Sequence, residues 1–188
     1  MMTHAAPASF TIRRLRANEA VASIEALADV LIDCVEGGAS VSFMQPLPRE
    51  KALAFWQGVA EGVARNERVL LIAEAADGAI VGTVQLITAM PENQPHRAEV
   101  AKMLVHRRAR KQGLAQRLMT ALEAAACDEG KTVLVLDTAT GGDAQRLYER
   151  ANWRRAGMVP NYALMPDGAY CSTTFFYKQL ESDAAVLA

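Results

Sequence analysis

The sequence lacks the features of a secreted or membrane-spanning protein. Its 188 residues include only three cysteines, Cys34, Cys127 and Cys171, and none of them forms a C-x-x-C pair. A small, odd and scattered set of cysteines is typical of a reduced cytosolic protein. Met1 to Ser9 have no apolar core of the kind that a signal peptide needs, and no apolar run approaches the ~20 residues that cross a bilayer. We therefore expect a cytoplasmic protein that makes no use of a membrane.

An excess of charge of either sign is also missing. The chain carries 20 basic and 21 acidic residues, a formal net charge of −1. No global field therefore attracts the protein to nucleic acid or anionic lipid, and any anion site must be local. His4, His96 and His106 share no spacing that would suit a metal. The sequence predicts neither a metal nor a nucleic-acid partner.

The sequence also lacks two common phosphate-binding motifs. It contains no internal repeat and no linker. The chain has no G-x-x-x-x-G-K-[ST] loop and no three-glycine dinucleotide fingerprint. With 51% hydrophobic and 22% charged residues, a chain of this length fits one globular domain. We place this single domain at residues 10–180, after a flexible N-terminus of residues 1–9 and before a C-terminal tail of residues 181–188.

The chain does contain alternating strand and helix patterns. Strand-like segments are expected at residues 10–15, 69–75, 80–89, 98–105, 133–136, 153–159 and 173–178. Helical spacing is expected at residues 19–36, 49–65, 113–129 and 143–152. Asn18 would cap the first helix, and the continuous apolar run at 133–136 predicts a fully buried central strand. The order β-α-α-β-β-β-α-β-α-β-β predicts an α/β (α+β) fold with one mixed sheet flanked by helices.

A basic loop between the strand at 98–105 and the helix at 113–129 is the most informative segment. It holds His106, two adjacent arginines, Arg110 and Lys111 before Gly113. The first turn of a helix has free backbone N–H groups and a positive dipole end, and Gly113 and Ala115 keep that backbone accessible to a pyrophosphate. The alternative is a solvated connector without a ligand.

The motif Arg110-x-x-Gly113-x-Ala115, with its flanking strand and helix, resembles the acyl-CoA-binding motif of the GCN5-related N-acetyltransferases (GNAT). The element order agrees over about residues 10–180. The resemblance implies a GNAT-type, mostly antiparallel sheet and acetyl-CoA as cosubstrate without a metal. It further implies that the strand pairs with the pantetheine arm and that the loop encloses the pyrophosphate, through Met103, Leu104, Val105, Arg110, Lys111, Gln112, Gly113, Leu114, Ala115 and Gln116.

The resemblance also implies a role for Tyr148. This residue matches the family's helix-borne tyrosine, which lies near the thioester sulfur and protonates the departing thiolate. A core aromatic residue with a satisfied hydroxyl is the alternative. Many members have an asparagine seven residues earlier that contacts the cofactor, whereas this chain has Gly141 there. The sequence therefore does not establish a cofactor contact from the Gly141 loop.

Four short segments resemble the tabtoxin-resistance acetyltransferase subgroup, whose members acetylate an amino-acid-like β-lactam toxin. They are residues 37–44, 97–103, 136–138 and 166–168. Since substrates diverge readily on one scaffold, a small amine is expected with more weight than the toxin itself. Phe43 and Met44, in the loop at 39–48, are candidates to wall the substrate site.

Two carboxylates are candidates for the base. An amine attacks a thioester only when it is neutral, so a group must remove its proton. Glu99 lies near the start of one strand, and Asp137 follows the buried strand at 133–136. The alternatives are a solvent-facing or salt-bridged Glu99 and an Asp137 that caps the turn at 138–142. A strand N–H near Leu104, freed by a bulge, would hold the developing oxyanion.

The sequence thus predicts a transferase that moves an acetyl group from acetyl-CoA to a small amine, such as an amino-acid-like antibiotic or toxin. A peptide or protein N-acetyltransferase is the first alternative, which the loop at 37–48 should disfavour by covering an open groove. A non-catalytic acyl-CoA sensor is the second, and a nucleic-acid module built on residues 107–111 is a weaker third. A homodimer is one oligomeric state that the sequence allows.

Overall fold

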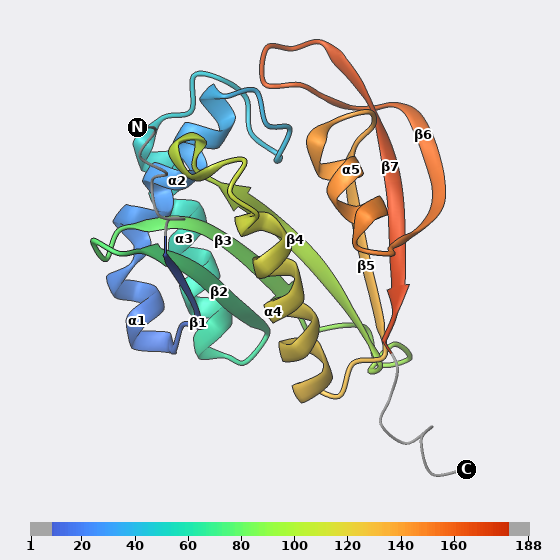
Figure 1. Cartoon of the computed structure of the whole chain (residues 1–188), viewed down its shortest axis with the longest axis horizontal. Helices are drawn as coiled ribbons and strands as arrows, with labels where there is room; N and C mark the ends of the chain where they lie inside the picture. The colour runs from blue at the N-terminus through green and yellow to red at the C-terminus, as the bar shows by residue number, and fades with distance from the viewer. Residues whose placement is uncertain (1–8, 181–188) are drawn as a thin grey trace, which may run out of the picture.

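One seven-stranded sheet runs through residues 9–180, the part of the chain that the computed structural model describes (Figure 1). In spatial order its strands are β1 (Phe10–Arg14), β2 (Arg68–Ala75), β3 (Ile80–Ile87), β4 (Arg97–Val105), β5 (Val133–Ala139), β7 (Tyr170–Gln179) and β6 (Arg154–Leu164). Only the β4–β5 pair is parallel. The mixed, mostly antiparallel sheet is therefore confirmed. Apart from Ser9, the predicted flexible N-terminus and tail lie outside the described residues.

Helices cover both faces of the sheet (Figure 1). Helices α4 (Leu114–Asp128) and α5 (Asp143–Arg150) pack on one face, where Leu118, Leu122 and Phe176 are buried together. Helices α1 (Ala17–Ala22), α2 (Ile24–Glu36) and α3 (Arg49–Ala64) cover the other, around Leu31 and Trp56. The two faces therefore have separate cores, and a ligand can approach the sheet from either side only where neighbouring strands part.

The helix expected at 19–36 is two helices, so that prediction is wrong in detail. Ser23 has φ −97° and ψ −1°, away from ideal helical values, and its N–H is shared between the carbonyls of Glu19 and Ala20. The expected cap at Asn18 is also wrong, because α1 begins at Ala17 and the cap position is Arg16. The Arg16 N–H donates to Glu19 Oε2 at 2.8 Å, which replaces the cap.

The strand expected at 133–136 is longer in the structure and includes Asp137. Strand β5 continues to Ala139, with Asp137 opposite Phe175 of β7. Among residues 9–180 the Asp137 carboxylate makes no hydrogen bond, so it does not cap the following turn. The strand is central, but Val133 and Val135 are only partly buried. The expected full burial is wrong because their face of β5 borders the opening described below.

Candidate active site

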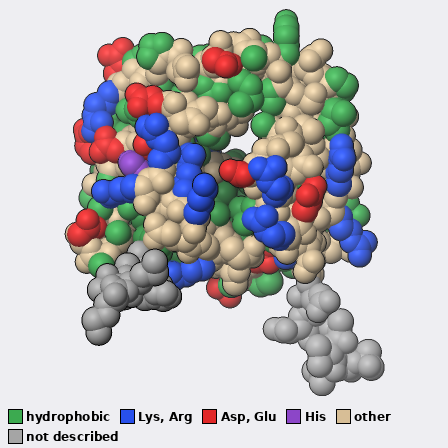
Figure 2. Space-filling model, turned by 45° about the horizontal axis from the view of Figure 1, so that its top comes forward, with side chains coloured by type: hydrophobic (Ala, Val, Ile, Leu, Met, Phe, Trp, Pro, Cys, Tyr) green, Lys and Arg blue, Asp and Glu red, His purple; other side chains and the backbone are tan. Residues whose placement is uncertain are grey.

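The parallel strands β4 and β5 part soon after they meet. They pair only through Arg97–Glu99 and Val133–Val135, so the β4 edge from Val100 to Val105 has no strand neighbour there. Figure 1 shows the two strands diverging, and Figure 2 shows a hollow between the half with α1–α3 and the half with α5, β6 and β7. Lys and Arg side chains gather on both sides of this hollow in Figure 2. Unpaired strand backbone is suited to hydrogen bonding with an extended ligand.

A bulge interrupts β4 beside this opening. Thr83 pairs with Leu104 and Gln85 pairs with Ala101, so Lys102 and Met103 together oppose one β3 residue. Lys102 has φ +51°, a left-handed conformation that is uncommon for a residue with a side chain. A bulge of this kind redirects side chains and releases backbone groups. The bulge expected next to Leu104 is present, while its use as an oxyanion site remains a prediction.

The N-terminus of α4 lies after this strand and offers free backbone donors. Gly113 occupies the cap position with φ +74°, and a Cβ there would meet nothing within 4 Å, so glycine is required by conformation rather than by space. Within residues 9–180, no hydrogen bond uses the backbone N–H groups of residues 111–116. These donors fit the pyrophosphate of the acetyl-CoA that the sequence motif implied.

Two of the loop arginines are engaged by protein groups. Asp33 of α2 accepts hydrogen bonds of 2.8 Å from both the backbone N–H and the Nε of Arg107. Burial raises the pKa of Asp33, but these hydrogen bonds outweigh it and the pKa is lowered. Arg110 turns back toward β4, and its Nε donates to the Val105 carbonyl at 3.0 Å. Both side chains therefore hold the loop in place through contacts within the protein.

Tyr148 of α5 combines a buried ring with an uncommitted hydroxyl. The ring packs against Trp153 and Phe176, with centroids 6.0 Å away in each case. Its hydroxyl forms no hydrogen bond with any residue in the 9–180 range. Burial, with a further contribution from the Asp137 carboxylate, raises the pKa of Tyr148, so the hydroxyl keeps its proton at neutral pH. The residue is suited to donate a hydrogen bond and unsuited to act as a base.

The two candidate carboxylates lie on the face of the sheet opposite α4 and α5. Glu99 pairs with Val135 in register, and Asp137 is two residues further along β5, so both side chains share a face. Glu99 is about half exposed and lies 3.9 Å from the Arg97 guanidinium. Asp137 is close enough to Tyr148 and Lys102 to affect the pKa of each. Of the two candidates, Asp137 is the carboxylate whose charge contributes to the raised pKa of Tyr148.

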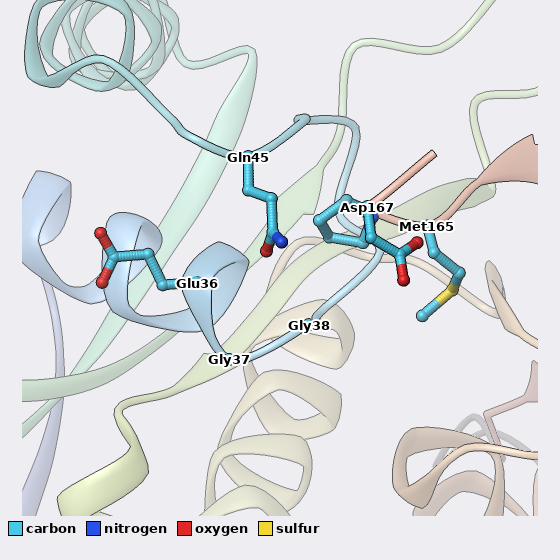
Figure 3. Close-up of a pocket in the computed structure, with 7 residues that line it drawn as sticks. Glu36, Gly37, Gly38, Gln45, Met165 and Asp167 are labelled. Carbon is cyan, nitrogen blue, oxygen red and sulfur yellow. The ribbon is translucent and has the colours of Figure 1, made fainter. Parts of the chain in front are cut away.

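The loop at 37–48 crosses toward the turn between β6 and β7. The Gln45 N–H donates to the Pro166 carbonyl at 3.0 Å, and Ser40 Oγ donates to the Leu164 carbonyl at 3.1 Å. Figure 3 shows the hollow of about 320 Å³ beside this crossing, with Gln45 pointing into it. Glu99, Asp137 and Tyr148 are not among the residues that line this hollow. That this loop closes a groove to peptides stays a prediction.

Of the two residues expected to wall the substrate site, Phe43 is packed and Met44 is exposed. Phe43 contacts Phe55 of α3 edge-to-face, with ring centroids 5.3 Å apart. The exposed fraction of Met44 is 42%. The Gly141 loop is held by an internal hydrogen bond, in which the Gly141 N–H donates to Gln145 Oε1 at 2.8 Å. This backbone N–H is therefore engaged within the loop, and a cofactor contact from Gly141 stays a prediction.

Sequence reasoning missed Lys102, which reaches into the opening from the bulge. Its Nζ lies 3.2 Å from Ser42 Oγ and 5.6 Å from the centre of the Phe55 ring. The signal was a lysine in an otherwise apolar stretch of strand, from Val100 to Val105. The strand alternation alone could not place it, because the bulge shifts the alternation at that residue.

Known proteins share this arrangement. A sequence model described as "Acetyltransferase (GNAT) family" matches residues 26–153. An uncharacterised N-acetyltransferase from the hisH-hisA intergenic region of Azospirillum brasilense is 35% identical over 113 residues, which are 59% of this chain and 65% of that relative. The match therefore spans slightly less than two thirds of that relative's length.

Solved structures share the fold. A Salmonella typhimurium protein described as an acetyltransferase, solved with its cofactor acetyl-CoA, has a TM-score of 0.74 at 19% identity and covers 93% of this chain and 95% of its own. A ribosomal-protein-alanine N-acetyltransferase from Brucella melitensis has a TM-score of 0.75 at 22% identity, covering 90% and 99%. Fold and site thus define an acetyltransferase-like α/β protein. The chain belongs to the acetyltransferase (GNAT) family.

The described residues contain neither a membrane-spanning helix nor a metal-binding cluster. No helix within residues 9–180 has the length and apolar character to cross a bilayer. In the same range, no three His, Cys, Asp or Glu side chains come together in a way that could hold a metal ion.

Proposed function

We propose that the protein transfers the acetyl group of acetyl-CoA to the amine of a small, amino-acid-like molecule. The observation that carries this proposal is the parting of β4 and β5, beside which α4 begins with free backbone donors. Asp137 and Glu99 on these strands and Tyr148 on α5 are the proposed catalytic residues. The domain that carries the activity is residues 10–180. Acetyl-CoA approaches from the α4–α5 face and the amine from the α3 face, so the two meet where the strands part.

Binding of the cosubstrate uses backbone more than side chains. The unpaired edge of Met103 to Val105 pairs with the amides of the pantetheine arm, and the N–H groups of Lys111 to Gln116 surround the pyrophosphate. The support is the absence of strand neighbours on this edge and of acceptors for those N–H groups among residues 9–180. When bound, acetyl-CoA supplies the activated acetyl group and the thiolate leaving group.

Asp137 or Glu99 removes the proton of the bound ammonium, directly or through a water molecule. The neutral nitrogen then forms the new C–N bond as the C–S bond of the thioester breaks. Tyr148 donates its hydroxyl proton to the departing sulfur, and the second proton that the nitrogen loses as the amide forms returns to Tyr148 through solvent. The strand N–H near Leu104 holds the oxyanion. Asp137 is favoured as the base because it is the carboxylate close to Tyr148.

A small acceptor is favoured over a peptide because the loop at 37–48 is fastened across the groove. Ser40 and Gln45 join it to Leu164 and Pro166. Phe43 and Met44 would contact the acceptor beneath this loop. The Brucella melitensis structure is named for a protein substrate, so a peptide or protein acceptor is the second candidate. An amino-acid-like toxin or antibiotic is the finer proposal, which rests on the four subgroup segments.

The test is release of CoA thiol from acetyl-CoA, followed with a thiol reagent across a panel of amines, amino acids and short peptides. We expect release that depends on an amine and is faster with small amines than with peptides. Faster release with peptides would favour the second candidate. If calorimetric titration shows no binding of acetyl-CoA, the small-amine proposal, the peptide alternative and the sensor alternative are all overturned.

Two further proposals concern the setting of the enzyme. We place it in the cytoplasm as a protein with reduced thiols, and Cys34, Cys127 and Cys171 are all free. Cell fractionation with thiol labelling tests this. A homodimer is the proposed assembly, supported by the exposed apolar side chains Met158, Val159 and Tyr162 on edge strand β6. Analytical ultracentrifugation that finds only monomers would overturn it.

A further inference from the structure

Lys102 is a cation held in an unusual position within the proposed acceptor site. Its backbone is left-handed in the β4 bulge, a conformation that is unfavourable for a residue with a side chain. The bulge directs the side chain toward the loop residue Ser42 and the ring of Phe55 in α3. A strained backbone that places one side chain in an opening points to a role for that side chain.

The Lys102 ammonium has no ion-pair partner among residues 9–180. Its one hydrogen bond there is with the neutral Ser42 hydroxyl, at 3.2 Å. Burial lowers the pKa of Lys102; the Asp137 carboxylate opposes this change and the Arg68 guanidinium adds to it. Asp137 is thus close enough to attract Lys102 but not close enough to neutralise it. A partly buried cation without a carboxylate partner is suited to an anionic ligand.

A neighbouring side chain, Gln85, has an unused hydrogen-bond donor. Gln85 of β3 lies opposite Ala101, directly before Lys102, and its Oε1 is already taken by Arg68 Nη1 at 2.8 Å. The Gln85 Nε2 is buried and has no partner within the described residues. This part of the site therefore has donors to spare, which favours a ligand rich in acceptors, such as a carboxylate.

We propose that Lys102 binds the carboxylate of an amino acid acceptor. The inference rests on the proposed function, since it assigns one end of the same acceptor to one residue. Lys102 on β4 and Asp137 on β5 then form a dipolar pair across the opening: the lysine holds the carboxylate, and the aspartate faces the ammonium of the same molecule. A free amino acid carries both charges, whereas a lysine side chain within a protein carries only the ammonium. Lys102 is therefore a specificity-determining residue for amino acids.

The experiment compares amino acids with their amino alcohols, which keep the amine and replace the carboxylate by a hydroxymethyl group. The wild-type enzyme is expected to prefer the amino acid by roughly 10- to 100-fold in kcat/KM, the ratio that a charge-assisted hydrogen bond of about 1.5–3 kcal/mol provides. Lys102→Met should remove this preference while the amino alcohol reacts as before. Lys102→Arg should keep part of it. Unchanged calorimetric affinity for acetyl-CoA checks that each variant is folded, and Lys102→Gln is a second neutral variant.

Lys51→Met is the matched control. Lys51 also lies over a phenylalanine ring, 5.8 Å from the centre of Phe43, but it is exposed. This variant should retain the full preference. Equal use of amino acids and amino alcohols by the wild type would overturn the inference and leave the proposed function standing. If the preference for amino acids survives in Lys102→Met, the inference is likewise overturned and the proposed function still stands. Failure to acetylate any amine would overturn the proposed function and this inference together.

Discussion

Asp33 and Arg107 join the end of α2 to the loop that precedes α4. The Asp33 carboxylate accepts hydrogen bonds of 2.8 Å from the Arg107 backbone N–H and from its Nε. His106 Nδ1 lies 3.5 Å from the same carboxylate, and Glu36 lies 3.8 Å from the Arg107 guanidinium. The proposed pyrophosphate loop is therefore positioned from outside by a carboxylate that does not belong to it.

Replacing Asp33 by asparagine should destabilise the protein at neutral pH by about 1–2 kcal/mol, since a hydrogen-bonded carboxylate is lost. The folded pKa of Asp33 is lowered, so its contribution is fully present above the unfolded pKa of about 3.9 and is lost as pH falls through the folded value. Urea unfolding of wild type and variant should therefore show a gap at about pH 7 that shrinks below about pH 4.

The exposed Asp143 provides the control for this change. Its pKa is also lowered, chiefly by a hydrogen bond from Arg146, but its side chain is 94% exposed. Asp143→Asn should leave unfolding unchanged because solvent screens such a pair. An Asp33→Asn gap that stayed constant with pH would show that the carboxylate charge is not responsible.

Gly113→Ala should weaken acetyl-CoA binding. Gly113 has φ +74° at the cap of α4, so alanine either strains the backbone by about 1–2 kcal/mol or rearranges the donors that face the pyrophosphate. Gly130→Ala is matched, because Gly130 follows the other end of α4 with φ +68° and similar open space. Calorimetry should find a Kd increased by about tenfold or more for Gly113→Ala and unchanged for Gly130→Ala. Equal affinities would exclude the helix N-terminus as the anion site.

Tyr148→Phe should reduce kcat by roughly 10- to 1,000-fold while acetyl-CoA affinity is kept, because only the hydroxyl is removed from a packed ring. Tyr162→Phe is the control: Tyr162 packs against Phe175 but is exposed on edge strand β6. Steady-state rates of thiol release give the comparison. Full activity in Tyr148→Phe would leave that residue only its packing role against Trp153 and Phe176.

Asp137→Asn should lower kcat/KM more than Glu99→Gln does, by about 100-fold or more, because an amide does not accept the ammonium proton. Glu99 remains beside Arg97, further from Tyr148, and a milder loss is expected there. Rates measured from about pH 6 to about pH 9 should show the Asp137→Asn loss shrinking at high pH, where the amine arrives neutral. A larger loss in Glu99→Gln would exchange the two roles.

Much of the fold could be predicted from local patterns. The Asp77-Gly78 turn gave the hairpin of β2 and β3, and the leucines at 114, 118 and 122 gave α4 with its buried face. The break at Ser23 could not be predicted, because the apolar spacing continues through it and no proline or glycine interrupts it. The insertion of β7 between β5 and β6 depends on long-range pairing that local patterns do not record.

The parts of the candidate site that lie in a sequence motif could be predicted. The parts whose position depends on an irregular backbone could not. Gly113 at the start of α4 follows from the strand-to-helix pattern, and the α4 N-terminus has the expected free donors. The role of Tyr148 came only from the family resemblance and stays a prediction. The position of Lys102 depends on a bulge, and the loop arginines were expected to face a phosphate without regard to Asp33. Contacts between Asp33 and Arg107 join distant parts of the chain, so no local pattern contains them.

Transfer of a ¹³C-labelled acetyl group from acetyl-CoA, followed by NMR in the presence of an amino acid that gives thiol release, tests the central claim most directly. We predict that the label appears as an N-acetyl amide in step with release of CoA thiol. Label that stays on CoA, or that leaves only as free acetate, would contradict an N-acetyltransferase acting on an amine.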